Sequence, residues 1–195
     1  MATTFLLIRH AAHSRVHDTL CGRMPGVTLS EEGRRQAEML GARVRAAGVA
    51  AVLSSPVQRA VETAGAFGLP VAVDAAFEEF DFGAWMGRRF DELSGDPAWQ
   101  AWNSRRGSSR PPGGESMEDV RQRAMTGLHR LRDERGASAV AIVSHGDVVK
   151  AILLGLLGMS DDAHDRIDVA PASISRVVMW DGGARVTGMN EVLGA

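Results

Sequence analysis

The chain has 195 residues, of which 45% are hydrophobic, and this is enough to bury one substantial core in a single domain. Its formal net charge of -2 argues against binding of nucleic acid or another polyanion, and its one cysteine, Cys21, excludes an internal disulfide and points to a reducing compartment. No segment reads as a signal peptide, and AILLGLLGM has about half the length of a membrane span. We therefore expect a cytoplasmic protein that contacts no membrane.

The first 76 residues alternate apolar runs with helical patterns. TFLLI predicts a strand, and apolar residues at helical spacing predict a helix that Ser30 caps and Gly48 ends. VAAVLSS predicts a second strand, and PVQRAVETAGAF predicts a helix with Ser55 as its cap and Pro56 in its first turn. PVAVD predicts a third strand.

Residues 77–115 contain three tryptophans and several glycines but show no sustained hydrophobic period. We expect an irregular excursion with short helices that covers the substrate. The arginines of SRRGSSR are expected to form a mobile basic loop. Exposed tryptophans of this stretch are the surface through which we consider a homodimer.

The last third of the chain returns to regular patterns. A long helix is predicted from Ser116, with Asp119 completing a capping box, to Gly136. AVAIVS predicts a strand, a helix should follow from Asp147 to Leu157, and the tail predicts two strands around an Asp-Gly-Gly turn. Alternating strands and helices predict one α/β domain over residues 1–195, a three-layer sandwich with a mainly parallel central sheet.

Basic and imidazole side chains gather where three of the predicted strands end. Arg9 and His10 follow the first strand, Arg59 lies in the helix after the second, and His145 follows AVAIVS. Ligands of open α/β sheets bind at the carboxyl ends of the strands, so we expect these four side chains to converge. Clustered guanidinium groups favour an anion such as phosphate and keep a neighbouring imidazole neutral, as a nucleophile must be.

Several motifs resemble the histidine phosphatase superfamily, in its phosphoglycerate mutase-like branch. RHA resembles the Arg-His-Gly triplet of that family, with Ala11 in place of glycine. Further matches follow in the order of the family, namely LSEEGRRQA, SSPVQRAVETA, EEFDFGAWMG, PGGES and VSHGDVV. Together these motifs span most of the chain, and their combination is specific although each alone would be weak.

The resemblance implies a mechanism without a metal or other cofactor. His10 would attack phosphorus to give a phosphohistidine, while Arg9, Arg59 and His145 would hold the phosphoryl oxygens and stabilise the transition state. The expected activity is hydrolysis of a small-molecule phosphate monoester. The identity of that ester lies beyond what the sequence specifies.

The acidic loop FEEFDFG places the proton donor of the family at Glu79, with Glu78 as the competing assignment. A carboxylic acid in this role needs a raised pKa, which an apolar wall can supply, and the candidates for it are Phe77, Phe80, Phe82 and Trp85. Arg23, in the loop CGRMPGV, is our candidate for a substrate contact outside the catalytic core.

Departures from the family leave other interpretations open. Ala12, His13 and Val16 stand where the family often has Glu, Thr and a phosphate-binding Asn, and Ala11 could hinder a backbone approach. The alternatives are a phosphoglycerate mutase-type phosphotransferase, against which the short chain argues, and a catalytically impaired module that binds a phospholigand. His10, His13 and His17 could also gather a transition metal, which we weigh as a minor alternative.

Overall fold

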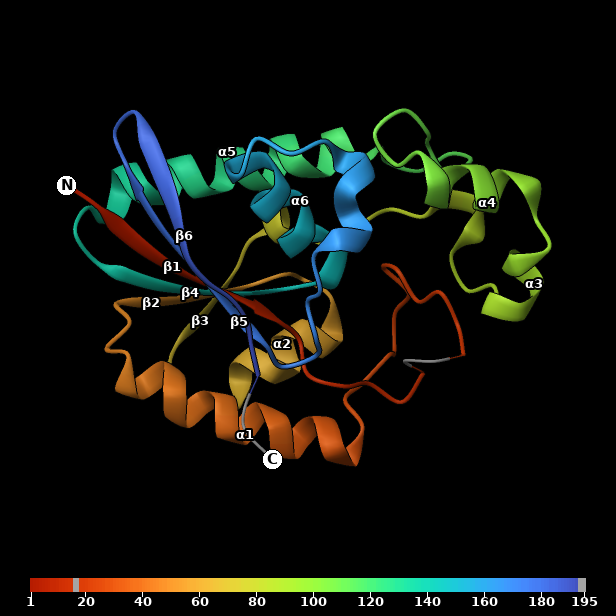
Figure 1. The fold of residues 1–195 in the computed structure, drawn as a ribbon. Coiled ribbons are helices and arrows are strands. Elements are labelled where there is room, and N and C mark those ends of the chain that lie inside the picture. The colour runs from red at the N-terminus through yellow and green to blue at the C-terminus, as the bar shows by residue number, and fades with distance from the viewer. Residues whose placement is uncertain (16–17, 193–195) are drawn as a thin grey trace.

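The computed structural model describes residues 1–15 and 18–192. It contains a central sheet with helices on both of its faces (Figure 1). The strands are β1 (Thr3–Arg9), β2 (Ala51–Ser54), β3 (Val71–Val73), β4 (Ala139–Ser144), β5 (Ile174–Trp180) and β6 (Gly183–Glu191). The α-helices are α1 (Glu31–Ala46), α2 (Gln58–Gly65), α3 (Phe90–Ser94), α4 (Pro97–Ser104), α5 (Met117–Arg135) and α6 (Gly146–Leu156).

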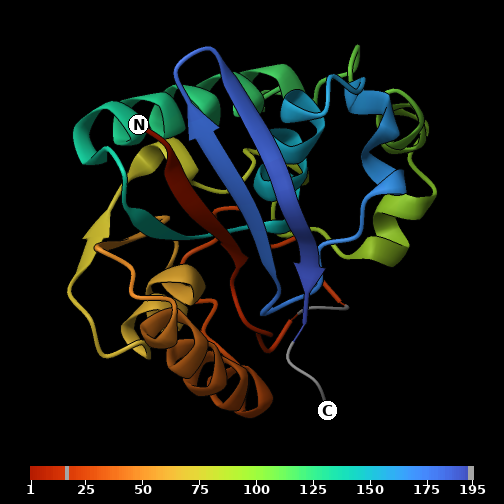
Figure 2. The same ribbon diagram turned by 60° about the vertical axis from the view of Figure 1, so that its left-hand side comes forward.

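The six strands follow the order β3-β2-β4-β1-β5-β6. Strands β1 to β4 are parallel to one another, and the hairpin β5-β6 joins β1 through an antiparallel pairing. Helices α1 and α2 cover one face and α5 and α6 cover the other, with a separate apolar core beneath each pair (Figures 1 and 2). The predicted three-layer α/β sandwich with a mainly parallel sheet is confirmed.

The caps of the two longest helices agree with the sequence. Ser30 accepts a hydrogen bond from the Gly33 amide at the start of α1, and Ser116 and Asp119 form the capping box of α5. Gly48 and Gly136 follow the two helices with positive φ, a conformation that glycine adopts without steric cost. These local signals determine where the helices begin and end because they satisfy backbone groups that lack partners within the helix.

Two helix starts differ from the prediction. Helix α2 begins at Gln58, with Val57 as its cap, and Ser55 lies outside the helix with its Oγ accepting the Val57 amide. The hydroxyl of Ser55 is oriented toward His145 instead, so its position serves the site and not the cap. Helix α6 begins one residue before the predicted Asp147, and a 3-10 helix at Asp161–Arg166 was not predicted at all.

Residues 77–115 form the irregular excursion that was expected, with the short helices α3 and α4 beside the sheet (Figure 1). The expected exposure of the tryptophans there was wrong, because they pack against each other, and the homodimer considered on that ground stays a prediction without this support. Trp85 and Trp102 are 2% and 1% exposed, and half-buried Trp99 contacts both rings. This aromatic cluster is continuous with the core beneath α5 and α6.

The expectation of a mobile basic loop was also wrong for Arg106. Its guanidinium carbon lies 3.6 Å from the ring centre of buried Trp102, and its Nη1 donates to Asp147 at 2.9 Å. The stacked cation therefore ties the excursion to α6. None of the helices described in this structure has the length and apolar character needed to cross a bilayer.

Candidate active site

Pairing of the parallel strands brings the predicted site residues together. Arg9 is paired with Ser144 in the register of β1 and β4, and the backbone amide of the next residue, His10, donates to the Ser144 carbonyl at 2.8 Å. His145 therefore lies beside His10, with 5.1 Å between the ring centres. Arg59 reaches the same place from the first turn of helix α2, which follows β2 and in which Arg59 is the second residue.

His10 is held as a neutral imidazole with a defined tautomer. Its Nδ1 lies 2.8 Å from the carbonyl oxygen of Ala11, and since a carbonyl can only accept, Nδ1 carries the proton. Its Nε2 accepts a hydrogen bond from Arg59 Nε at 3.0 Å and so has a lone pair. Burial, and next the guanidinium of Arg59, hold the pKa of His10 well below 6.5. The side chain is thus equipped to act as a nucleophile through Nε2.

Arg59 lies at the centre of the site and is only 1% exposed. Its Nη2 donates to the Gly22 carbonyl at 2.8 Å and lies 3.3 Å from Glu79 Oε2 and 3.2 Å from His145 Nδ1. One guanidinium therefore contacts both histidines and the carboxyl group. It is the group most able to stabilise charge on an anion held among them.

His145 is completely buried at the start of α6. Its Nε2 lies 2.7 Å from Ser55 Oγ, and its Nδ1 faces the Arg59 guanidinium, which can only donate. The ring is therefore neutral, with its proton on Nε2. Burial, followed by Arg59, holds the pKa of His145 well below 6.5.

Glu79 presents its carboxyl group to the two histidines. Oε2 lies 3.3 Å from His145 Nδ1, and Oε1 accepts the Phe80 amide at 2.8 Å. Burial raises the pKa of Glu79 to about 7, although the positive charge of Arg59 opposes the shift. Phe82 lines the same cavity and contributes to the apolar surroundings. Such a carboxyl group can give up and take back a proton near neutral pH.

Two arginines hold the backbone of Glu79. Arg23 and Arg123 both donate to its carbonyl oxygen, at 2.8 and 3.1 Å, and Glu115 forms ion pairs with both guanidinium groups at 2.9 and 3.0 Å. Arg23 does not line the cavity, so the structure places this predicted substrate contact behind Glu79. Glu78 is turned toward Arg23, 3.5 Å away, and not toward the histidines.

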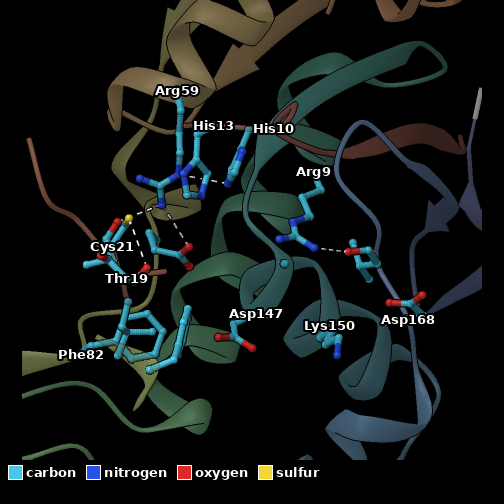
Figure 3. A pocket seen from close by; sticks show the side chains of 16 residues that line it. Arg9, His10, His13, Thr19, Cys21, Arg59, Phe82, Asp147, Lys150 and Asp168 are labelled. Carbon is cyan, nitrogen blue, oxygen red and sulfur yellow. Dashed lines mark hydrogen bonds and ion pairs between the residues drawn. The ribbon is translucent and has the colours of Figure 1, made fainter. Parts of the chain in front are cut away.

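His10, Arg59 and Glu79 line a cavity of about 210 Å³, and His145 is buried behind it (Figure 3). Arg9 lines it, and its Nη1 donates to the Val169 carbonyl at 2.6 Å. Arg9 Nε and Arg59 Nη1 are buried nitrogens that have no hydrogen-bond partner in the described part of the chain. Since a buried unpaired donor is costly, these two nitrogens mark a place where an anion would be stabilised.

The described residues with ligand atoms close enough to share a cation are His10, Glu79 and His145, whose atoms lie within 4.8 Å of one another. Arg59 donates into the middle of this group, and its fixed positive charge opposes binding of a metal cation there. His13, which the sequence suggested together with His10 and His17 as a possible metal ligand, is not in this group, and its Nδ1 accepts the Arg15 amide at 3.3 Å. His17, like Val16, lies outside the described residues.

The backbone after His10 is fixed by hydrogen bonds, and Ala11 fits there without strain. Thr63 Oγ1 accepts the Ala11 amide at 3.1 Å and donates to the Arg59 carbonyl at 2.7 Å, which fixes the segment after His10. Among the described non-glycine residues, only Ala172 and Asn190 have positive φ, so Ala11 needs no left-handed conformation. The methyl group that replaces the family's hydrogen therefore adds no backbone strain.

Sequence reasoning missed three polar residues at the cavity mouth, namely Asp147, Lys150 and Asp168. Asp147 and Lys150 are three residues apart on α6, so they share the helix face that follows His145. That spacing was a usable signal. Asp168 lies in the irregular segment before β5, where no periodic pattern could have placed it at the site.

The fold and the site define a class of α/β proteins in which buried arginines surround a neutral histidine at the strand ends. A family model described as "Histidine phosphatase superfamily (branch 1)" matches residues 5–192. The chain therefore belongs to the histidine phosphatase superfamily, as the motif resemblance predicted.

Curated relatives agree with this membership. A bifunctional protein of Mycobacterium tuberculosis is 35% identical over 188 residues, which are 93% of this chain and 52% of that protein. The chain thus spans about half the length of that relative. A probable phosphoglycerate mutase, GpmB of Erwinia tasmaniensis, is 33% identical over 155 residues, with 76% of this chain and 72% of the relative covered.

Solved structures share the whole fold. YhfR of Bacillus stearothermophilus superposes with a TM-score of 0.92 at 28% identity, covering 98% of both chains. A mutant phosphoserine phosphatase from Entamoeba histolytica, in complex with phosphoserine, has a TM-score of 0.85 at 25% identity, covering 96% of both chains. A mycobacterial glucosyl-3-phosphoglycerate phosphatase has a TM-score of 0.86 at 25% identity, covering 98% of this chain and 100% of that one.

Proposed function

We propose that this chain is a metal-independent phosphatase that hydrolyses a small phosphate monoester through a phosphohistidine on His10. The observation that carries the proposal is the pair of unpartnered buried nitrogens, Arg9 Nε and Arg59 Nη1, next to an imidazole that is kept neutral. Phosphatases among the structural relatives support the same class of reaction.

In the first step His10 Nε2 attacks phosphorus, and the bond between phosphorus and the ester oxygen breaks. Arg59 and Arg9 line the space of the phosphoryl oxygens, where their fixed positive charge stabilises the transition state. His145 acts from behind the cavity, because its Nδ1 accepts from Arg59 Nη2 and so helps to orient that guanidinium group. Glu79 transfers its proton to the departing oxygen, so the leaving group departs as a neutral alcohol.

In the second step Glu79, now ionised, takes a proton from a water molecule that attacks the phosphohistidine. The bond between phosphorus and Nε2 breaks, inorganic phosphate leaves, and both His10 and Glu79 return to their starting states. The pKa of Glu79 near 7 suits both roles, since acid and base forms are each populated at neutral pH.

The relative named as a probable phosphoglycerate mutase supports a second candidate, a phosphotransferase that returns the phosphoryl group to a bound intermediate. The two reactions share the phosphohistidine and differ in the acceptor. Product analysis with 3-phosphoglycerate separates them, because hydrolysis releases inorganic phosphate and the transferase reaction yields an isomeric phosphoglycerate.

The proposal is tested by hydrolysis of an aryl phosphate in excess chelator, with wild type, His10→Ala and the control His129→Ala. His129 is an exposed histidine on α5, far along the chain from the site motifs. We expect the His10 variant to lose about 10⁴-fold in kcat while the control keeps wild-type activity. Rapid quenching in base should also trap an acid-labile phosphoenzyme in wild type and in the control, and none in His10→Ala. Activity that chelator abolishes, or that survives in His10→Ala, would contradict the mechanism.

A further inference from the structure

The mouth of the cavity has two unlike walls (Figure 3). Leu20, Cys21, Phe82 and Phe90 contribute mainly apolar surface on one side. The other wall comes from helix α6 and the segment before β5 and contains three charged residues beyond the phosphoryl-binding arginines: Asp147, Lys150 and Asp168. This charged wall lies beside the phosphoryl-binding residues around the same cavity, so it can contact polar groups of a leaving group.

One of these charges is already compensated within the protein. Asp147 Oδ1 accepts a hydrogen bond from Arg106 at 2.9 Å. By contrast, the side chains of Lys150 and Asp168 form no hydrogen bond or ion pair with any other residue within 1–15 and 18–192. The two lie too far apart to form an ion pair with each other, although the Asp168 charge still acts on the Lys150 ammonium group.

Lys150 is half-buried in this wall and Asp168 is exposed. Lys150 is also the only lysine of the chain, in which 22 residues are lysine or arginine. A half-buried ammonium group and a nearby carboxylate without partners are best satisfied by a ligand that supplies one group of each sign. A doubly anionic leaving group would be repelled by the carboxylates of Asp147 and Asp168, and a purely cationic one would be repelled by the ammonium group of Lys150.

The cavity has a volume of about 210 Å³ and opens to solvent at its mouth. The phosphoryl group therefore occupies its inner part, and a small zwitterion suits the charges of the wall beside the mouth.

We propose that Lys150 and Asp168 form a specificity subsite for a zwitterionic leaving group, with a carboxylate facing Lys150 and an ammonium group facing Asp168. The substrate class is the phosphate monoester of a small hydroxy amino acid. This subsite rests on the proposed phosphatase function and adds the chemistry by which the leaving group is recognised.

The test uses three matched esters and two variants. O-phosphoserine carries both charged groups, 3-phosphoglycerate carries the carboxylate with a hydroxyl, and phosphoethanolamine carries the ammonium group alone. Wild type should show its highest kcat/KM with O-phosphoserine. Lys150→Met should lower kcat/KM about tenfold for the two esters with a carboxylate and leave phosphoethanolamine unchanged. Asp168→Asn should lower it by a similar factor for the two esters with an ammonium group and spare 3-phosphoglycerate.

Two controls make the outcome specific. Asp181→Asn and Arg185→Met change the same charges at exposed positions in or beside the β5-β6 turn, at the opposite end of the sheet, and should leave all three esters unaffected. Equal effects of Lys150→Met or Asp168→Asn on every ester, or no effect on any, would overturn the subsite. Hydrolysis of an aryl phosphate distinguishes the failures, since its absence in wild type rejects the phosphatase and its presence without this selectivity rejects only the subsite.

Discussion

The two sides of the cavity are built from different kinds of structure. His10, Arg59 and His145 lie at the ends of neighbouring parallel strands or in the first turn beyond them, where sheet register fixes their separation. Glu79 lies instead in an irregular stretch, and its position depends on hydrogen bonds that its backbone carbonyl accepts from the side chains of Arg23 and Arg123, which come from two other segments. The strand-end side is fixed by the sheet, whereas the position of Glu79 depends on contacts that single substitutions can remove one at a time.

The largest effect is expected on the strand-end side. Arg59→Lys keeps the positive charge but removes the forked contacts to His10, Glu79 and His145, so kcat for an aryl phosphate should fall about 10³-fold. Steady-state kinetics beside Arg88→Lys, a conservative change at a partly exposed arginine of the excursion, provides the comparison. A loss below about tenfold in Arg59→Lys would show that charge alone suffices at this position.

A smaller and more selective effect is expected at Glu79. Glu79→Gln removes the proton donor, so kcat should fall about 10²-fold for an alkyl phosphate and much less for p-nitrophenyl phosphate, whose leaving group needs no proton. In wild type kcat/KM for the alkyl ester should fall as pH rises through about 7, where Glu79 loses its proton. The variant should lack this alkaline limb. An unchanged pH profile would assign the limb to another group.

The support behind Glu79 should have a weaker influence. Glu115→Gln removes the negative charge that orders Arg23 and Arg123, so we expect a loss of about tenfold in kcat for alkyl phosphates and little change for aryl phosphates. Both rates are measured at the pH optimum of each protein. Glu118→Gln, at the start of α5, serves as the matched control because its side chain is 70% exposed. Equal losses on the two ester types would mean that the strand-end side was disturbed as well.

The smallest effects concern stability against pH, and the two sides should differ in sign. The folded pKa of His145 is lowered below 6.5, so the unfolded chain binds the extra proton and stability is lost as pH falls below about 6.5. The folded pKa of Glu79 is raised from 4.5 to about 7, so its contribution is lost as pH rises across that interval. Each contributes at most about 1.4 kcal/mol per pH unit.

Urea denaturation at pH 5, 6 and 7 measures these slopes. Between pH 5 and 6, His145→Gln should flatten the rise of the unfolding free energy with pH, and Glu79→Gln should steepen it. Slopes that change in the same direction in both variants would contradict the opposed protonation states described for the two sides.

The strand-end side is also the part that the sequence predicts well. Arg9, His10 and His145 directly follow or end apolar runs, and parallel strands place such residues at one edge of the sheet. Caps such as Ser30 and Ser116 act within a few residues, so local sequence contains their whole signal.

The excursion side could not be read in the same way because its contacts join distant segments. The pairing of Arg106 with Asp147 joins residues that are 41 positions apart, and no periodic pattern encodes it. The stacking of Arg106 on Trp102 joins residues only four apart, but it depends on the burial of Trp102 in the aromatic cluster. Basic composition suggested a mobile loop there, and tryptophan content suggested an exposed surface, but packing buried both. Arg23 was noticed as a polar residue near the site, while its hold on the Glu79 carbonyl depends on Glu115 from a separate segment.

The aromatic cluster also gives the molecule an optical property. Three of its four tryptophans, Trp85, Trp99 and Trp102, lie in ring contact within the excursion, and the fourth, Trp180, ends β5 on the far side of the sheet. Intrinsic fluorescence therefore reports mainly on this one segment. Replacing Trp180 with phenylalanine would leave an emission spectrum that follows the folding of the excursion alone, without an added dye.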